Sequence, residues 1–177
     1  LAATLEFYGL TAEDLAKGFS SFLGIKRRQQ ILGSPSGITV VDDFAHHPTA
    51  IDLTLSGLKM KFGDRRLWAI FEPRSATSRR NTFQEQFPPA FRPADIVVLA
   101  PPFNQSGIPV DERLDADQLI SDIRSQDQEA FLWGSAPEGV DDWSPANSAD
   151  VIANAVVSNS QPGDVIAILS NGGFGGV

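Results

Sequence analysis

The sequence contains no cysteine, and it has only one methionine and one tyrosine among its 177 residues. The lack of cysteine excludes disulfides, thiolate metal sites and cysteine nucleophiles. No apolar run approaches the ~20 residues that a membrane-spanning helix needs, so we expect no membrane span. The chain also lacks the Gly-Lys-Ser/Thr end of a Walker phosphate loop.

Basic residues are scarce relative to acidic ones. The chain has 14 Lys and Arg against 22 Asp and Glu, for a formal net charge of -8. A general surface for nucleic acid or for an anionic membrane needs an excess of Lys and Arg. The composition therefore argues against nucleic-acid and membrane partners.

Hydrophobic residues make up 42% of the chain, which is enough for a real core. Roughly 100–200 residues form one domain, so we expect one domain plus a tail. The first residues, 1–9, lack an initiator Met and the basic start and cleavage site of a signal peptide. These features predict a piece of a longer cytoplasmic protein.

Short apolar runs alternate with amphipathic stretches along most of the chain. Their periodicity and the turn residues between them predict strands at 30–32, 38–41, 67–71, 96–99, 130–133 and 165–169. The same patterns predict helices at 2–7, 11–24, 51–62, 78–87, 115–123 and 146–157. This alternation predicts an α/β, Rossmann-like fold whose sheet is mostly parallel with one antiparallel strand, and with helices on both faces.

In such sheets, ligands bind beyond the carboxyl ends of the strands. The segments that follow the strands are 42–48, 72–80, 100–107 and 170–176. We therefore expect these segments to hold the residues that carry chemistry.

The segment 42–48 reads DDFAHHP and holds both histidines of the chain. A carboxylate at a strand end commonly binds a ribose diol, so Asp43 is a candidate ribose ligand and an imidazole one turn on can stack on a nucleotide. The alternative is that one Asp and one His cap the following helix. A metal site is weaker, because adjacent histidines rarely bind one ion and no third ligand has a familiar spacing.

Three further clusters are candidates for binding anions. The basic run Lys26-Arg27-Arg28 suits a phosphate or a base edge, or else forms a solvated turn. The segment 72–80 (EPRSATSRR) has three Arg at a predicted strand-to-helix junction, which is an anion site unless its last two Arg pair with Glu85 or solvent. The segment 170–176 (SNGGFGG) is either a loop whose backbone approaches a ligand or a flexible end.

Together these segments resemble the C-terminal domain of the Mur ligase family. The resemblance is carried by GIKRR at 24–28, DDFAHHPT at 42–49 and the strand–helix alternation after them. Mur ligases are ATP-dependent enzymes that join amino acids or peptides to UDP-N-acetylmuramic acid. The stretches FEPRS at 71–75, TSRR at 77–80, LAPPF at 99–103 and LSNGGFGG at 169–176 most resemble members that attach L-alanyl-γ-D-glutamyl-meso-diaminopimelate, a murein tripeptide, in peptidoglycan recycling.

The resemblance implies binding roles for several residues and no catalytic or metal-ligating ones. It places nucleotide contacts on Arg28, Asp43 and His46. It implies that the peptide's carboxylates are oriented by residues of the two later segments, namely Arg74, Ser78, Arg79, Ser170 and Asn171. The chemistry it implies passes through an acyl phosphate, so catalysis consists mostly of positioning and charge stabilisation.

The resemblance also implies what the chain lacks. The family's phosphate loop and Mg²⁺ ligands lie in a central domain, and its UDP-sugar site lies in an N-terminal domain. We therefore expect residues 1–23 to end the central domain and residues 24–177 to form the C-terminal domain, inactive alone, whose partners include those two domains. The alternatives are an L-alanine-adding ligase domain, a non-catalytic nucleotide- or peptide-binding module, and a metal-dependent hydrolase that uses Asp42, Asp43, His46 and His47.

Overall fold

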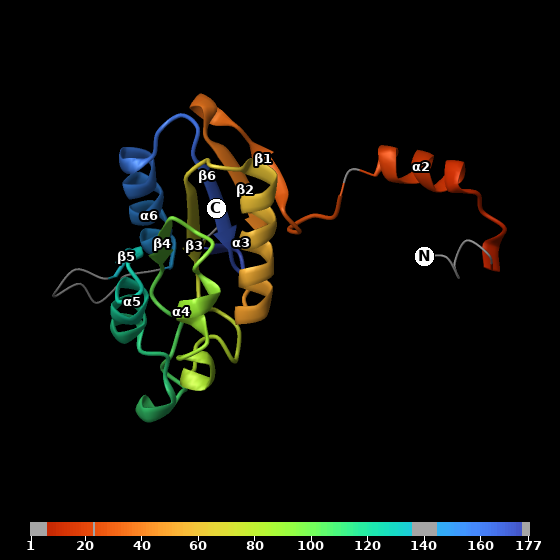
Figure 1. Cartoon of the computed structure of the whole chain (residues 1–177). Helices are drawn as coiled ribbons and strands as arrows, with labels where there is room; N and C mark the ends of the chain where they lie inside the picture. Colours follow the sequence, from red (N-terminus) through yellow and green to blue (C-terminus); the bar gives the residue numbers. More distant parts are fainter. Residues whose placement is uncertain (1–6, 23, 136–144, 175–177) are drawn as a thin grey trace.

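A computed structural model describes residues 7–22, 24–135 and 145–174 of the chain. Its centre is a six-stranded sheet in the order β1-β2-β6-β3-β4-β5 (Figure 1). The strands are β1 (Gln30–Gly33), β2 (Thr39–Asp43), β3 (Leu67–Phe71), β4 (Ile96–Leu99), β5 (Glu129–Leu132) and β6 (Val165–Leu169). Only the β1–β2 pair of this sheet is antiparallel, so the predicted α/β fold class is confirmed.

Helices cover both faces of the sheet, as predicted. On one face lie α3 (Pro48–Phe62), α4 (Phe87–Ala90) and α5 (Ala116–Arg124), and on the other lies α6 (Pro145–Asn159) (Figure 1). The larger apolar cluster lies under the first group and includes the fully buried Phe71, Phe87 and Phe91. The smaller cluster lies under α6 and includes the buried Trp68. No helix in the described ranges is long and apolar enough to cross a membrane.

One predicted helix is wrong. Residues 78–87 do not form a helix but a series of turns, a 3-10 helix at Asn81–Phe83 and then the single turn of α4. Ser75 and Ser78 bond to each other through hydroxyl and backbone atoms, which competes with helical bonding. Arg80 is extended and forms an isolated bridge with Arg113. The predicted helix N-terminus for binding an anion is therefore absent.

The helix expected at 11–24 is present as α2 (Ala12–Ser21). Its capping box is the predicted one, since the Thr11 hydroxyl and the Asp14 carboxylate each accept the other residue's backbone N–H. None of the residues of α2 is buried; Phe19 within the helix and Phe22 at its C-cap are both about three-fifths exposed. Figure 1 shows α2 apart from the sheet. The helix expected at 2–7 lies mostly outside the described residues.

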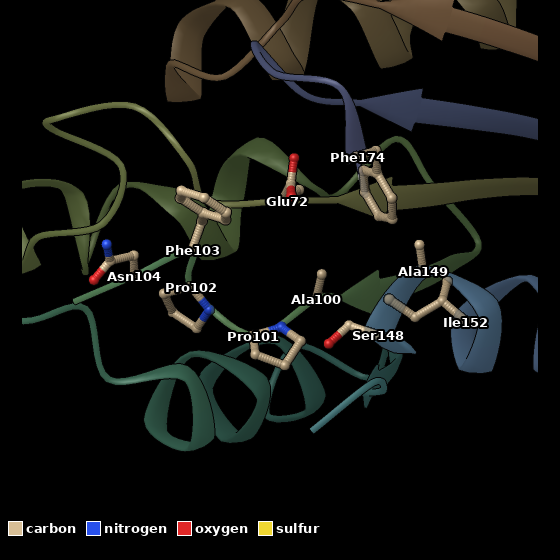
Figure 2. A pocket seen from close by; sticks show the side chains of 10 residues that line it. All are labelled: Glu72, Ala100, Pro101, Pro102, Phe103, Asn104, Ser148, Ala149, Ile152 and Phe174. Carbon is tan, nitrogen blue, oxygen red and sulfur yellow. The ribbon is translucent and has the colours of Figure 1, made fainter. Parts of the chain in front are cut away.

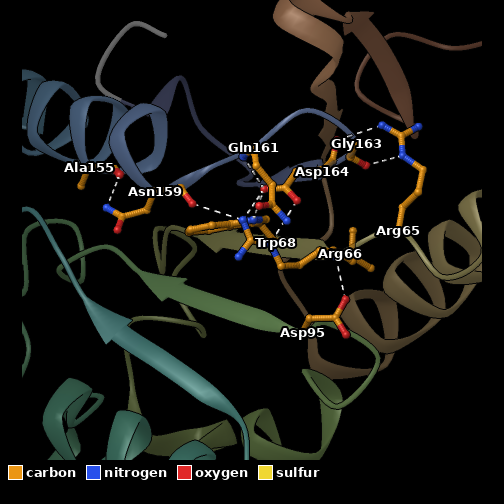
Figure 3. Close-up of polar contacts among 10 residues, drawn as sticks. Arg65, Arg66, Trp68, Asp95, Ala155, Asn159, Gln161, Gly163 and Asp164 are labelled. Atoms are coloured by element: carbon orange, nitrogen blue, oxygen red, sulfur yellow. Dashed lines mark hydrogen bonds and ion pairs between the residues drawn. The ribbon is translucent and has the colours of Figure 1, made fainter.

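A buried carboxylate organises the end of the sheet opposite the candidate site (Figure 3). Asp164 precedes β6, and its two oxygens accept 3.0 and 2.7 Å bonds from Nε and Nη2 of Arg66. Trp68 Nε1 and the Gln161 backbone N–H also donate to it, each at 3.0 Å. Burial of Asp164 opposes ionisation, but the hydrogen bonds from Arg66, Gln161 and Trp68 outweigh it and hold the pKa of Asp164 below its ordinary value.

We expect Asp164→Asn to lower the free energy of unfolding by about 2 kcal/mol at neutral pH, because a charged acceptor of three groups is lost. The native pKa is depressed, so this stabilisation is complete above the unfolded-state pKa of about 4 and is lost as the pH falls through the native value. Urea unfolding at pH 7 and pH 3 measures it, with the exposed Asp64→Asn as control. If wild type and Asp164→Asn differ in their free energy of unfolding by the same amount at both pH values, the depressed pKa of Asp164 is contradicted.

Candidate functional site

The four segments predicted from the strand ends meet at one edge of the sheet. The strands β2, β6, β3 and β4 are neighbours, and all four run in the same direction. Their carboxyl ends therefore bring Asp43, Ser170, Glu72 and Ala100 into one row, in that order. Segments more than 100 residues apart in sequence form one site.

Asp43 closes β2 and is 4% exposed. Its Oδ1 accepts the backbone N–H of Ala45 at 2.8 Å and the hydroxyl of Thr54 at 3.3 Å, and its Oδ2 accepts the backbone N–H of Gln29 at 2.7 Å. The carboxylate thus holds the segment before β1 against the end of β2. Asp43 does not cap α3.

The two histidines have different surroundings. His47 is the N-cap of α3 and accepts the backbone N–H of Thr49 at 3.3 Å, so the predicted capping alternative holds for this residue. His46 is half-buried, its Nδ1 lies 2.9 Å from the carbonyl oxygen of Phe44, and its ring meets the Phe44 ring edge-on at 5.3 Å. His46 is therefore the histidine whose ring lies beside the end of β2.

Arg28 and Arg27 both lie close to the ring of Phe44. Arg28 is exposed, with its Cζ 5.2 Å from the centre of the Phe44 ring. Arg27 donates to the carbonyl oxygens of Ser170 and Gly172, the latter at 2.7 Å, and pairs with Asp42 at 3.3 Å. The sequence predicts no separate role for Arg27, because nothing in the run of basic residues distinguishes it from its neighbour.

Arg74 lies against the glycine-rich segment, residues 170–174, from the side opposite Arg27. Its Cζ is 3.8 Å from the centre of the Phe103 ring, and its Nη1 is 3.4 Å from Oε1 of Glu72. A Cβ atom at Gly172 would lie 2.0 Å from Cδ of Arg74, which no side chain tolerates. Glycine at this position therefore makes room for Arg74, and the segment is held between two arginines.

Three residues that were predicted to contact the peptide form hydrogen bonds within the chain instead. The buried Ser78 hydroxyl bonds to the Ser75 hydroxyl at 2.8 Å. Arg79 donates to the carbonyl oxygens of Phe103 and Asn104, at 3.2 and 2.6 Å. The buried Ser170 hydroxyl donates to Oε2 of Glu72 at 2.6 Å. These side chains shape the loops of the site.

Asn171 differs from these three. Its Oδ1 is buried and has no hydrogen-bond partner among the described residues. A buried acceptor without a donor costs about 1–3 kcal/mol, so a donor from a bound molecule would be favourable here.

The metal-dependent hydrolase alternative lacks its ligand set. Within the described parts of the chain, no three His, Cys, Asp or Glu side chains are grouped to hold an ion. Asp42 pairs with Arg27, Asp43 binds backbone N–H groups and His47 caps a helix. Three of the four residues proposed for that alternative therefore serve separate structural purposes.

A cavity of about 390 Å³ opens at the ends of β3 and β4 (Figure 2). Its walls come from the 100–104 loop, the start of α6 and Phe174 of the glycine-rich segment. Glu72 is the one ionisable residue among those that line it. Figure 2 shows the Glu72 carboxylate between the rings of Phe103 and Phe174.

Comparison with known proteins identifies the family of the chain. Residues 27–172 match the family model described as "Mur ligase, glutamate ligase domain". The chain is 35% identical, over 99% of its length, to a UDP-N-acetylmuramate–L-alanyl-γ-D-glutamyl-meso-2,6-diaminoheptandioate ligase of Escherichia coli K12. It is 32% identical, over 89% of its length, to a UDP-N-acetylmuramate–L-alanine ligase of Geobacter sulfurreducens.

A solved structure is similar over almost the whole chain. The murein peptide ligase of Psychrobacter arcticus 273-4 matches 98% of this chain and 33% of its own, with 32% identity and a TM-score of 0.67. The chain likewise spans only 34% and 31% of the two curated relatives. The family model matches residues 27–172, and the Escherichia coli relative aligns with 99% of this chain. The chain therefore belongs to the Mur ligase family.

Proposed function

We propose that this chain is the C-terminal domain of an ATP-dependent ligase that joins L-alanyl-γ-D-glutamyl-meso-diaminopimelate to UDP-N-acetylmuramate in the cytoplasm, during peptidoglycan recycling. Residues 24–177 would form the domain and residues 1–23 the end of the central one. The observation that carries the proposal is the row of strand ends around the glycine-rich segment. His46 and Arg28 lie by Phe44 at the end of β2, and Arg74 lies at the end of β3. The 35% identity to the tripeptide-adding relative supports the choice of substrate.

The residues around Phe44 fit a nucleotide. Arg28 offers an exposed cation, and the half-buried His46 offers a ring for hydrogen bonding or stacking. Asp43 would act here by holding the Gln29 backbone and, through it, the neighbouring Arg28. ATP, when bound, supplies the phosphoryl group that activates the muramoyl carboxylate, and Mg²⁺ would be held by residues outside this chain.

The other side of the glycine-rich segment fits the peptide. The tripeptide carries several carboxylates, and Arg74 and Asn171 are the polar side chains placed to meet it most directly. Ser78, Arg79 and Ser170 would contribute by fixing the loops around the cavity. Two substrates held at one edge of one domain are positioned together when the domains close, which is where much of the rate enhancement arises.

The runner-up is a ligase domain that adds L-alanine, which is favoured by the 32% identical relative. The deciding experiment assays the full-length ligase with UDP-N-acetylmuramate and ATP, offering the tripeptide or L-alanine. We expect ligation of the tripeptide and at most trace ligation of L-alanine. Efficient ligation of L-alanine alone would overturn the proposed substrate.

The isolated chain should show no ATPase or ligase turnover. The cradle for the β- and γ-phosphates is missing from its sequence, and that cradle supplies most of the transition-state stabilisation in phosphoryl transfer. Phosphate release from ATP by the purified chain measures this. Release that is abolished by Asp43→Ala would mean that the chain is an enzyme by itself.

In the full-length ligase, Arg28→Ala should raise the KM for ATP about tenfold, because a charge-assisted contact is lost. Asp43→Ala should raise it as well and also lower the thermal midpoint, since two backbone N–H groups lose a buried acceptor. Lys61→Ala, an exposed basic residue outside this cluster, is the control. If ATP kinetics stay at wild-type values in both variants, the nucleotide lies elsewhere.

Arg74→Lys should reduce kcat/KM for the tripeptide at least about tenfold while the KM for ATP changes less than about twofold. Lys cannot reproduce a forked contact with a carboxylate or the stacking on Phe103. Steady-state kinetics with each substrate varied in turn measures both values, with the exposed Arg92→Lys as control. Unaltered use of the tripeptide would leave Arg74 as an ion-pair residue only.

A further inference from the structure

Glu72 is a buried acid to which the proposed function gives no role. It follows β3, is 5% exposed and lines the cavity shown in Figure 2. Burying a carboxylate away from water is costly unless it is paired and hydrogen-bonded. The partners of this carboxylate within the described chain are the Ser170 hydroxyl at 2.6 Å and Arg74 at 3.4 Å.

The pairing with Arg74 is loose. Charge-assisted bonds between a guanidinium and a carboxylate are usually about 2.7–2.9 Å and often forked. Here a single nitrogen lies 3.4 Å away, and the guanidinium is placed over the Phe103 ring instead. Each carboxylate oxygen accepts two hydrogen bonds, so Glu72 keeps capacity for a further donor, and Arg74 keeps N–H groups for a further acceptor.

The strand order tells which part of a substrate would reach this pair. The nucleotide-side residues follow β2, whereas Glu72 and the cavity lie at the ends of β3 and β4, beyond β6. The amino group that is ligated has to approach the nucleotide side. The far end of an incoming peptide would therefore extend toward β3 and β4.

We infer that Glu72 is a specificity residue that binds the ammonium group at the far end of the incoming peptide, while Arg74 binds the carboxylate on the same carbon. This assignment rests on the proposed function. The third residue of that tripeptide ends in a carbon that carries both an ammonium and a carboxylate. An acid and a guanidinium side by side match those two charges with the correct signs.

The cavity fits the rest of that residue. A volume of about 390 Å³ accommodates a short methylene chain together with its charged end. Phe103, Ile152 and Phe174 supply apolar walls for the methylenes, and an aromatic face also favours a nearby ammonium. Bound in this way, the ligand would replace the loose ion pair by two better ones.

The competing explanation is that Glu72 only fixes the Ser170 loop. Three peptides separate the two explanations in the full-length ligase: the diaminopimelate tripeptide, an analogue ending in 2-aminopimelate, which lacks the distal ammonium, and one ending in lysine, which lacks the distal carboxylate. We expect Glu72→Gln to lower kcat/KM at least about tenfold for the two peptides with a distal ammonium. For the 2-aminopimelate peptide, kcat/KM should change less than about twofold. Glu85→Gln, which changes an exposed acid outside the 72–80 segment, is the control and should leave kcat/KM unchanged for all three peptides.

Equal losses on all three peptides would overturn the inference and leave Glu72 as a loop-fixing residue, and so would no loss on any. If Glu72→Gln does not fold, Glu72→Asp is assayed in the same way. Its carboxylate is one methylene further from the cavity, so the preference for diaminopimelate over 2-aminopimelate should fall, and an unchanged preference overturns the inference. Wild-type enzyme that ligates none of the three peptides refutes the proposed function instead.

Discussion

The insertion of β6, the last strand of the described chain, between β2 and β3 is the constraint on which the site depends. Each residue of β6 pairs with one on β2 and one on β3, and Leu169 lies opposite both Asp43 and Phe71. The glycine-rich segment that follows β6 therefore begins between the carboxyl ends of β2 and β3. Without this pairing, the segments after β2 and β3 would not share the glycine-rich segment as a neighbour.

Buried ions secure both ends of this strand. Before β6, the Asp164 carboxylate accepts hydrogen bonds from Arg66, Trp68 and a backbone N–H group, while its backbone carbonyl accepts the backbone N–H of Thr39. After β6, the Ser170 backbone N–H reaches the Asp43 carbonyl and its hydroxyl reaches Glu72. Each of these acids would be costly to bury alone, so the same contacts that satisfy them also determine where the loops lie.

The glycine-rich segment is where the two substrate regions of the proposed site meet. Arg27 holds its carbonyl oxygens from the side of Phe44, and Arg74 occupies the space that a side chain at Gly172 would need. Arg27 and Arg74 therefore contact the same short loop from its two sides. That arrangement suits a domain in which nucleotide and peptide have to be positioned together.

The sequence by itself determined the fold class and the positions of the strands. The bounds of β3, β4 and β6 follow directly from apolar runs between turn residues, because a strand buried on both faces has to be apolar throughout. The capping box of α2 and the four segments at the strand ends were equally predictable, since each depends on residues close together in the chain.

Only the tertiary structure decided what the individual side chains do. The predicted helix at 78–87 is replaced by turns because Ser75 and Ser78 bond to each other and Arg80 bridges to Arg113. Arg27 and Arg28 are neighbours of identical type, and only the position of the glycine-rich segment, more than 140 residues away, separates their roles. Glu72 gained its place in the cavity in the same way. Local periodicity decides which residues are buried, but the partners of a buried polar group come from distant strands, and the packing of the whole sheet selects them.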